Sequence, residues 1–97
     1  MNQVEAMRET LRQAQRVDAD RNGGVTTSEA SCHEVTYLGC SDDPTSLMHL
    51  VSMSARMMEG GMSDAKLGRW LGYAQGVLVT RGLLTLEECK EINRSFA

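Results

Sequence analysis

Apolar residues recur at three- and four-residue steps along this sequence, and this spacing most limits what the chain can fold into. Val4, Met7, Leu11 and Ala14 form one such stripe. The spacing matches the turn of an α-helix and places these side chains on one face. No segment alternates apolar and polar residues as a half-buried strand does, and Pro44 is the single proline. The sequence therefore predicts an all-α fold, a small bundle of four to five short helices.

Breaks in the pattern and capping residues indicate where the first helices begin and end. The stripe predicts a first helix over residues 3–17, and a second, short helix is expected over residues 27–37. Asp43 and Pro44 predict the start of the next helix, because an aspartate carboxylate caps a helix and proline suits its first turn. The glycines at positions 60–61 are expected to end that helix.

Residues 63–97 are expected to form a helix, a turn and a second helix. Ser63 is placed to cap the first of these, and Gly82 stands where a helix commonly ends. Thr85 and Glu88 have the spacing of a capping box, in which each side chain bonds the other residue's backbone N–H. With 97 residues and no internal linker, residues 1–97 are expected to form a single domain.

Three glycines, Gly68, Gly72 and Gly76, recur every four residues within the predicted helix that Ser63 caps. Each destabilises a helix interior by up to about 1 kcal/mol relative to alanine. Together with Trp70 nearby, they predict a shallow face on which another backbone approaches closely. The occupant is either the first or third helix of the same molecule, or a partner, which includes a second copy in a homodimer. In both cases we expect this helix to organise the fold.

Residues 18–26 form a polar segment that has two interpretations. DADRNGGVTTSE, residues 18–29, resembles the calcium-binding loop of the EF-hand family at its ligand positions. The resemblance implies a Ca²⁺ site, the one cofactor expected here, with the ligands Asp18, Asp20, Asn22, Gly24, Thr26 and Glu29. Alternatively, the glycine-containing stretch is a polar turn, and Thr26 and Glu29 are a capping box at the start of a helix.

Charge and cysteine content narrow the functional classes. The net charge is −3 with scattered basic residues, which argues against direct nucleic-acid binding. No apolar run is long enough for a membrane span, and three cysteines without a disulfide spacing indicate a cytoplasmic protein. Cys32, His33, Cys40 and His49 match no compact zinc motif. No catalytic constellation is recognisable, so the chain is not expected to be an enzyme.

The C-terminal third resembles a module of small phage and prophage accessory proteins. The resemblance lies in GRWLGYAQGVLVTRGLLTLEECKEINRSF, residues 68–96, through Arg69, Trp70, Leu71, Gly72, Tyr73, Gln75, Gly76, Gly82, Thr85, Glu88, Asn93 and Arg94. It implies a phage-type protein in the cytoplasm of a bacterial host, where such proteins commonly act by occluding a host macromolecule. The resulting hypothesis is a binding protein with an anti-defence, anti-CRISPR-like role. The alternative is a calcium-binding, EF-hand-like protein.

Overall fold

The computed structural model describes residues 1–22 and 43–97, which form four helices and contain no strand. The helices are α1 (Gln3–Asn22), α3 (Leu47–Met58), α4 (Asp64–Thr80) and α5 (Leu86–Ser95). The predicted all-α bundle is therefore confirmed. The helix expected over residues 27–37 lies outside the described residues. Within the described residues, no helix has the length and apolar character needed to cross a membrane.

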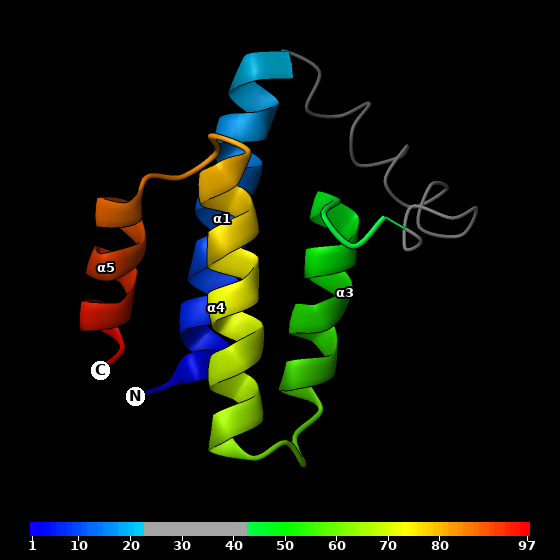
Figure 1. Ribbon diagram of the computed structural model, residues 1–97, viewed down its shortest axis with the longest axis vertical. Helices are drawn as coiled ribbons and strands as arrows, with labels where there is room; N and C mark the ends of the chain where they lie inside the picture. Colours follow the sequence, from blue (N-terminus) through cyan, green and yellow to red (C-terminus); the bar gives the residue numbers. More distant parts are fainter. Residues whose placement is uncertain (23–42) are drawn as a thin grey trace.

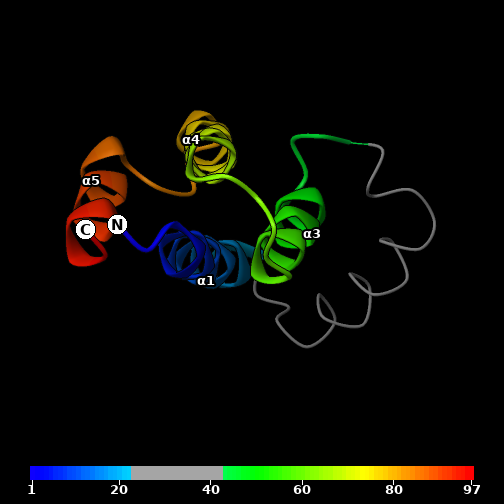
Figure 2. The same cartoon turned by 90° about the horizontal axis from the view of Figure 1, so that it is seen from below.

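Helix α1 is the centre of the bundle. It packs against α3, α4 and α5, and α3 and α4 also contact each other. Figures 1 and 2 show α5 and α3 on either side of α1, with α4 lying across one side of this row. The expectation that α4 organises the fold is wrong, because α1 packs against all three other described helices, whereas the extensive contacts of α4 are with α1 and those with α3 are few. In Figure 2 no other described helix covers the side of α4 that faces away from α1.

The core is built from aliphatic side chains and methionines, as the scarcity of aromatic residues requires. Met7, Leu50 and Leu78 are completely buried and come from α1, α3 and α4. The stripe predicted on α1 is confirmed, since Met7, Leu11 and Ala14 are all buried. The other buried apolar residues in the described ranges are Ala6, Met53, Met57, Leu71, Ala74, Leu83, Leu84, Cys89 and Ile92. Trp70 and Phe96 pack against this core from its edges.

Helix α1 continues through Asn22 rather than ending at Val17 as predicted. Residues 18–21 are aspartate, alanine, aspartate and arginine and include no glycine or proline, so nothing in the backbone stops the helix there. The Arg21 guanidinium donates a hydrogen bond to the carbonyl of Gly82 at 2.7 Å. This bond ties the last turn of α1 to the α4–α5 turn, so tertiary contact supports the additional helical turn.

Helix α3 begins at Leu47, with Ser46 as its N-cap, so the start predicted at Asp43 and Pro44 is wrong. The Ser46 hydroxyl accepts a hydrogen bond from the backbone N–H of His49 at 3.0 Å. Asp43 instead closes a turn, because its carboxylate accepts bonds from the backbone N–H and the hydroxyl of Thr45 at 2.9 and 2.7 Å. Ser46 directly precedes the apolar residues of α3 and therefore caps this helix in place of Asp43.

The caps predicted for α4 and α5 are confirmed. Ser63 accepts a bond from the backbone N–H of Lys66, and Gly82 follows the helix with a φ of 76°. Such a φ is unfavourable for any residue with a side chain, which explains the glycine. Thr85 and Glu88 form the capping box, with bonds of 2.8 and 3.1 Å between side chain and backbone.

Loss of this capping box is expected to destabilise the protein measurably. Thr85→Ala removes the acceptor for the Glu88 backbone N–H, and we expect the free energy of unfolding to fall by about 1 kcal/mol. Urea unfolding followed by circular dichroism measures the change. Ser95→Ala is the matched control, because its hydroxyl only bonds the Glu91 carbonyl on the exposed side of the same helix. Equal losses in the two variants would show that the cap is not what stabilises α5.

One buried amide connects three helices. The side-chain amide of Gln75 on α4 donates to Thr10 Oγ1 on α1 at 3.2 Å and to Asn93 Oδ1 on α5 at 2.9 Å. Asn93 donates back to Gln75 Oε1 at 3.2 Å, and Thr10 donates to the Ala6 carbonyl at 2.7 Å. No buried side-chain polar atom among the described residues lacks a partner. The network therefore fixes the relative register of α1, α4 and α5 without leaving an unsatisfied group.

A double-mutant cycle tests this network. Gln75→Leu leaves the Asn93 amide without its partner, and we expect a loss of about 2 kcal/mol in the free energy of unfolding. Adding Asn93→Leu removes that orphaned amide, so the second change should add little to the first. Chemical unfolding of both single variants and the double variant gives the coupling energy. Strictly additive losses would mean that the two amides stabilise the fold independently.

Candidate binding surface on helix α4

The three glycines of α4 do not share one environment. A Cβ atom added at Gly68 would lie 3.1 Å from Nε2 of Gln3 on α1, so this glycine permits a close contact within the molecule. Gly72 and Gly76 are exposed, and a Cβ atom added at either would meet no atom of the described residues within 4 Å. The intramolecular interpretation of the glycine row thus accounts for Gly68 alone. Gly72 and Gly76 leave bare helix backbone on the outside of the protein.

Gly72 and Gly76 form part of an open groove of about 560 Å³ beside the turn that precedes α3. The Tyr73 hydroxyl donates to the Pro44 carbonyl at 2.5 Å, and the Arg81 guanidinium donates to the Thr45 carbonyl at 2.7 Å. These two bonds hold the turn against α4 and so fix one wall of the groove. The lining residues are Thr45, Gly72, Tyr73, Gly76, Val77, Thr80 and Arg81.

Trp70, which was predicted to belong with the glycines, lies on a different side of α4. It is partly buried against the core. The Arg56 guanidinium carbon and the Lys66 ammonium nitrogen lie 5.7 and 5.3 Å from the centre of its ring, within cation–π range. Trp70 therefore holds two cations at the α3–α4 contact and does not line the groove.

The electrostatics of the groove are set by Arg81 at one end. Asp43 lies near it, and the pKa of its carboxyl group is lowered, first by the hydrogen bonds from Thr45 and then by the charges of Arg81 and His49. Further along α4, Arg69 is exposed and forms no hydrogen bond or ion pair with another described residue. From the sequence, Arg69 stood out only as part of the phage-like resemblance and Arg81 did not stand out, because neither belongs to a charge cluster in the chain.

The predicted calcium ligands are only partly within the described residues. Asp18, Asp20 and Asn22 lie in the last turns of α1, and Gly24, Thr26 and Glu29 lie outside the described residues. Residues two apart on a helix point about 200° apart, so Asp18 and Asp20 face different sides of α1. In the part of the chain that the structure describes, no three potential metal-ligating side chains come together. The calcium site therefore stays a prediction.

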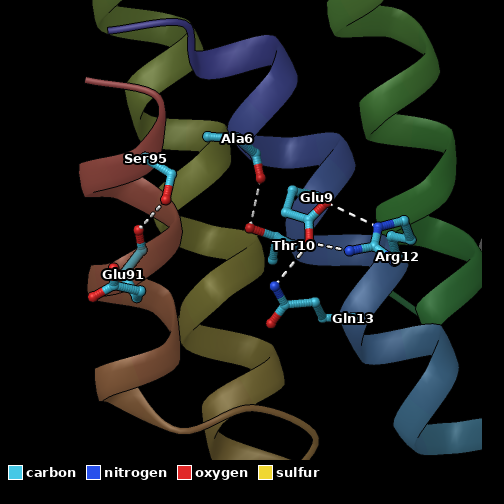
Figure 3. Close-up of polar contacts among 7 residues, drawn as sticks. All are labelled: Ala6, Glu9, Thr10, Arg12, Gln13, Glu91 and Ser95. Atoms are coloured by element: carbon cyan, nitrogen blue, oxygen red, sulfur yellow. Dashed lines mark hydrogen bonds and ion pairs between the residues drawn. The ribbon is translucent and has the colours of Figure 1, made fainter.

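A second groove, of about 340 Å³, lies between α1 and α5 and contains several carboxylates. Figure 3 shows the carboxylate of Glu9 between Arg12 and Gln13, both of which donate to it. These bonds and the Arg12 charge lower the pKa of Glu9. On α5, the Glu91 carboxylate pairs with Arg94 at 2.9 Å, and its backbone carbonyl accepts from Ser95. These two carboxylates are thus engaged by neighbours on their own helices.

The cysteine and histidine residues within the described part of the chain do not lie together in a site. Cys89 is buried, and burial followed by the charge of Glu88 raises the pKa of its thiol. A raised pKa keeps the thiol protonated and unreactive at neutral pH. His49 lies partly buried on α3, and Cys32, His33 and Cys40 are outside the described residues.

The chain matches no protein-family model, no curated protein and no solved structure. Candidate functional residues therefore rest on the geometry of this molecule alone. The groove on α4 combines exposed helix backbone, a half-exposed tyrosine and the side chain of Arg81. Such a surface suits contact with a macromolecule better than the enclosure of a small molecule, because it is open along its length.

Proposed function

We propose that this protein acts by binding a host macromolecule and occluding it, through the outer face of α4. The observation that carries this proposal is the exposure of Gly72 and Gly76, over which residues 1–22 and 43–97 place no atom within reach of an added Cβ. Two glycines in the interior of a helix reduce its stability, and no contact among the described residues offsets that loss. A partner whose backbone approaches α4 at these positions would give the missing compensation.

The kind of activity follows from the shape and composition of this face. A groove without bulky side chains at its floor lets another helix approach closely, and Tyr73, which is 41% exposed, offers an aromatic contact at its edge. The resemblance of residues 68–96 to phage accessory proteins covers this same helix. It supports a role inside a bacterial host, where the protein would block a component of the host defence as anti-CRISPR proteins do.

Affinity capture from bacterial host lysate, with quantitative mass spectrometry, tests the proposal. Gly72→Leu/Gly76→Leu fills the groove floor with side chains and should lose the captured partner by at least about tenfold. Glu87→Leu/Lys90→Leu is the matched control, because it adds two leucines to the exposed side of α5 without changing the net charge. It should retain the partner. No specific partner, or equal loss in both variants, would contradict a role for the α4 face.

The same face is the predicted homodimer contact. Light scattering on the purified protein distinguishes a host partner from a second copy of the chain as the occupant of this face. A host partner requires that the α4 face is free in the purified protein. A dimer that dissociates in Gly72→Leu/Gly76→Leu and persists in Glu87→Leu/Lys90→Leu would assign the face to a second copy instead.

A further inference from the structure

The cations around α4 differ from those elsewhere in the described chain. All four ion pairs between described residues lie within α1 or within α5, each between residues three apart. The basic residues of α3, of α4 and of the turn after α4 take part in none of these ion pairs. Arg56 and Lys66 lie over the Trp70 ring, and Arg81 donates to a backbone carbonyl. The positive charge beside the groove is therefore not neutralised by a contacting carboxylate within the described residues.

The charged residues along most of α4 are all basic. Residues 65–81 contain Lys66, Arg69 and Arg81 and no acidic residue. Asp64 precedes this stretch, and Asp43 lies near Arg81 with its carboxylate already bonded to Thr45. Arg69 and Arg81 are separated by about 18 Å along the helix axis, at 1.5 Å per residue. The bare backbone of the two glycines lies between them.

We infer that the partner segment is an acidic α-helix that lies along this groove, an inference that rests on the proposed function. Its small side chains contact the backbone at Gly72 and Gly76, and its carboxylates reach Arg69 and Arg81. Complementary charge at Arg81 in the groove and at Arg69, which lies beyond the glycines on α4, sets the direction and register of the incoming helix. The chemistry of the occupant is thus a protein helix with small residues on one face and acidic residues flanking them.

A nucleic acid is the competing anionic partner, and the geometry favours it less. Glycines at the floor of the groove give no side-chain donors to phosphates or bases. A phosphate backbone requires several closely spaced cations along its path, whereas Arg69 and Arg81 stand far apart. The net charge of −3 of the whole chain also opposes approach to a polyanion.

Paired peptides test the charge preference. Two alanine-rich helical peptides of roughly 20 residues are compared, which carry either glutamate or lysine at positions that would lie opposite Arg69 and Arg81. The readout is the movement of the backbone amide resonances of Gly72 and Gly76 in ¹⁵N-labelled protein during titration. The glutamate peptide should move these resonances and bind about fivefold tighter than the lysine peptide, because two exposed ion pairs contribute modestly.

Charge reversal supplies the control. Arg69→Glu changes an exposed side chain without a partner among the described residues, so the fold should be unaffected, and the preference should shift toward the lysine peptide. Equal responses to the two peptides, a preference for lysine in the unaltered protein, or no movement at Gly72 and Gly76 would overturn the inference. Larger movement with a thymidine oligonucleotide than with the glutamate peptide would also overturn it. If host-protein capture still depends on the glycines, these outcomes leave the proposed function standing.

Discussion

Replacing Gly72 and Gly76 together with alanine is expected to raise the free energy of unfolding by about 2 kcal/mol. Each glycine lowers the stability of a helix interior by up to about 1 kcal/mol relative to alanine, and the added methyl groups meet no atom in the described part of the chain. For a domain of this size the melting temperature should rise by about 10 °C. Thermal and urea unfolding followed by circular dichroism measure both quantities.

Gly68→Ala is the internal control for this prediction. Its Cβ atom would lie 3.1 Å from the end of the Gln3 side chain, which must move to accommodate it. The gain in stability should therefore be smaller than at Gly72 or Gly76. A loss of stability in Gly72→Ala/Gly76→Ala would show that these positions are already in contact within the molecule. In that case their exposure would not point to a partner.

Stabilising substitutions in natural proteins are either neutral for function or reduce it where the replaced residue serves function. If the α4 face binds a partner, the alanine substitutions should stabilise the protein while weakening the complex. Stability and binding would then change in opposite directions in the same variant. A variant that gains stability and keeps full binding would remove the functional reason for the glycines.

Leu78→Ala is expected to lower the free energy of unfolding by about 3 kcal/mol. Leu78 is completely buried on α4, and truncating such a side chain removes apolar contacts and leaves a cavity. This loss is a large share of the roughly 5–15 kcal/mol by which domains are stable. Urea unfolding gives the value, and Leu86→Ala is the control because Leu86 is 59% exposed. Similar losses at the two positions would contradict the arrangement of the core.

Much of the fold was predictable because it depends on local rules. The apolar stripe of α1 and the caps at Ser63 and Thr85 follow from residues three or four positions apart, and all are confirmed. The errors concern the ends of helices, where a contact between distant residues or a second possible cap determines the boundary. Arg21 bonds Gly82 across the bundle and accompanies the extension of α1, and Ser46 replaces Asp43 as the cap of α3.

The candidate surface was predictable only in part. The spacing of the glycines shows that they share one side of α4, but it does not show which of them another helix covers. That depends on how α1 crosses α4, which brings Gln3 to Gly68 and leaves Gly72 and Gly76 open. The groove wall formed by the bonds of Tyr73 and Arg81 to the preceding turn also joins segments that are distant in the chain.

Site-specific photo-cross-linking in living host cells tests most directly whether the outer face of α4 is the functional surface. A benzoylphenylalanine at Thr80, which is exposed and lines the groove, is compared with the same residue at Lys90 on the exposed side of α5. We predict a discrete cross-linked host protein from Thr80 that is absent from Lys90 and disappears in the Gly72→Leu/Gly76→Leu background. The same product from both positions, or none from Thr80, would contradict this account.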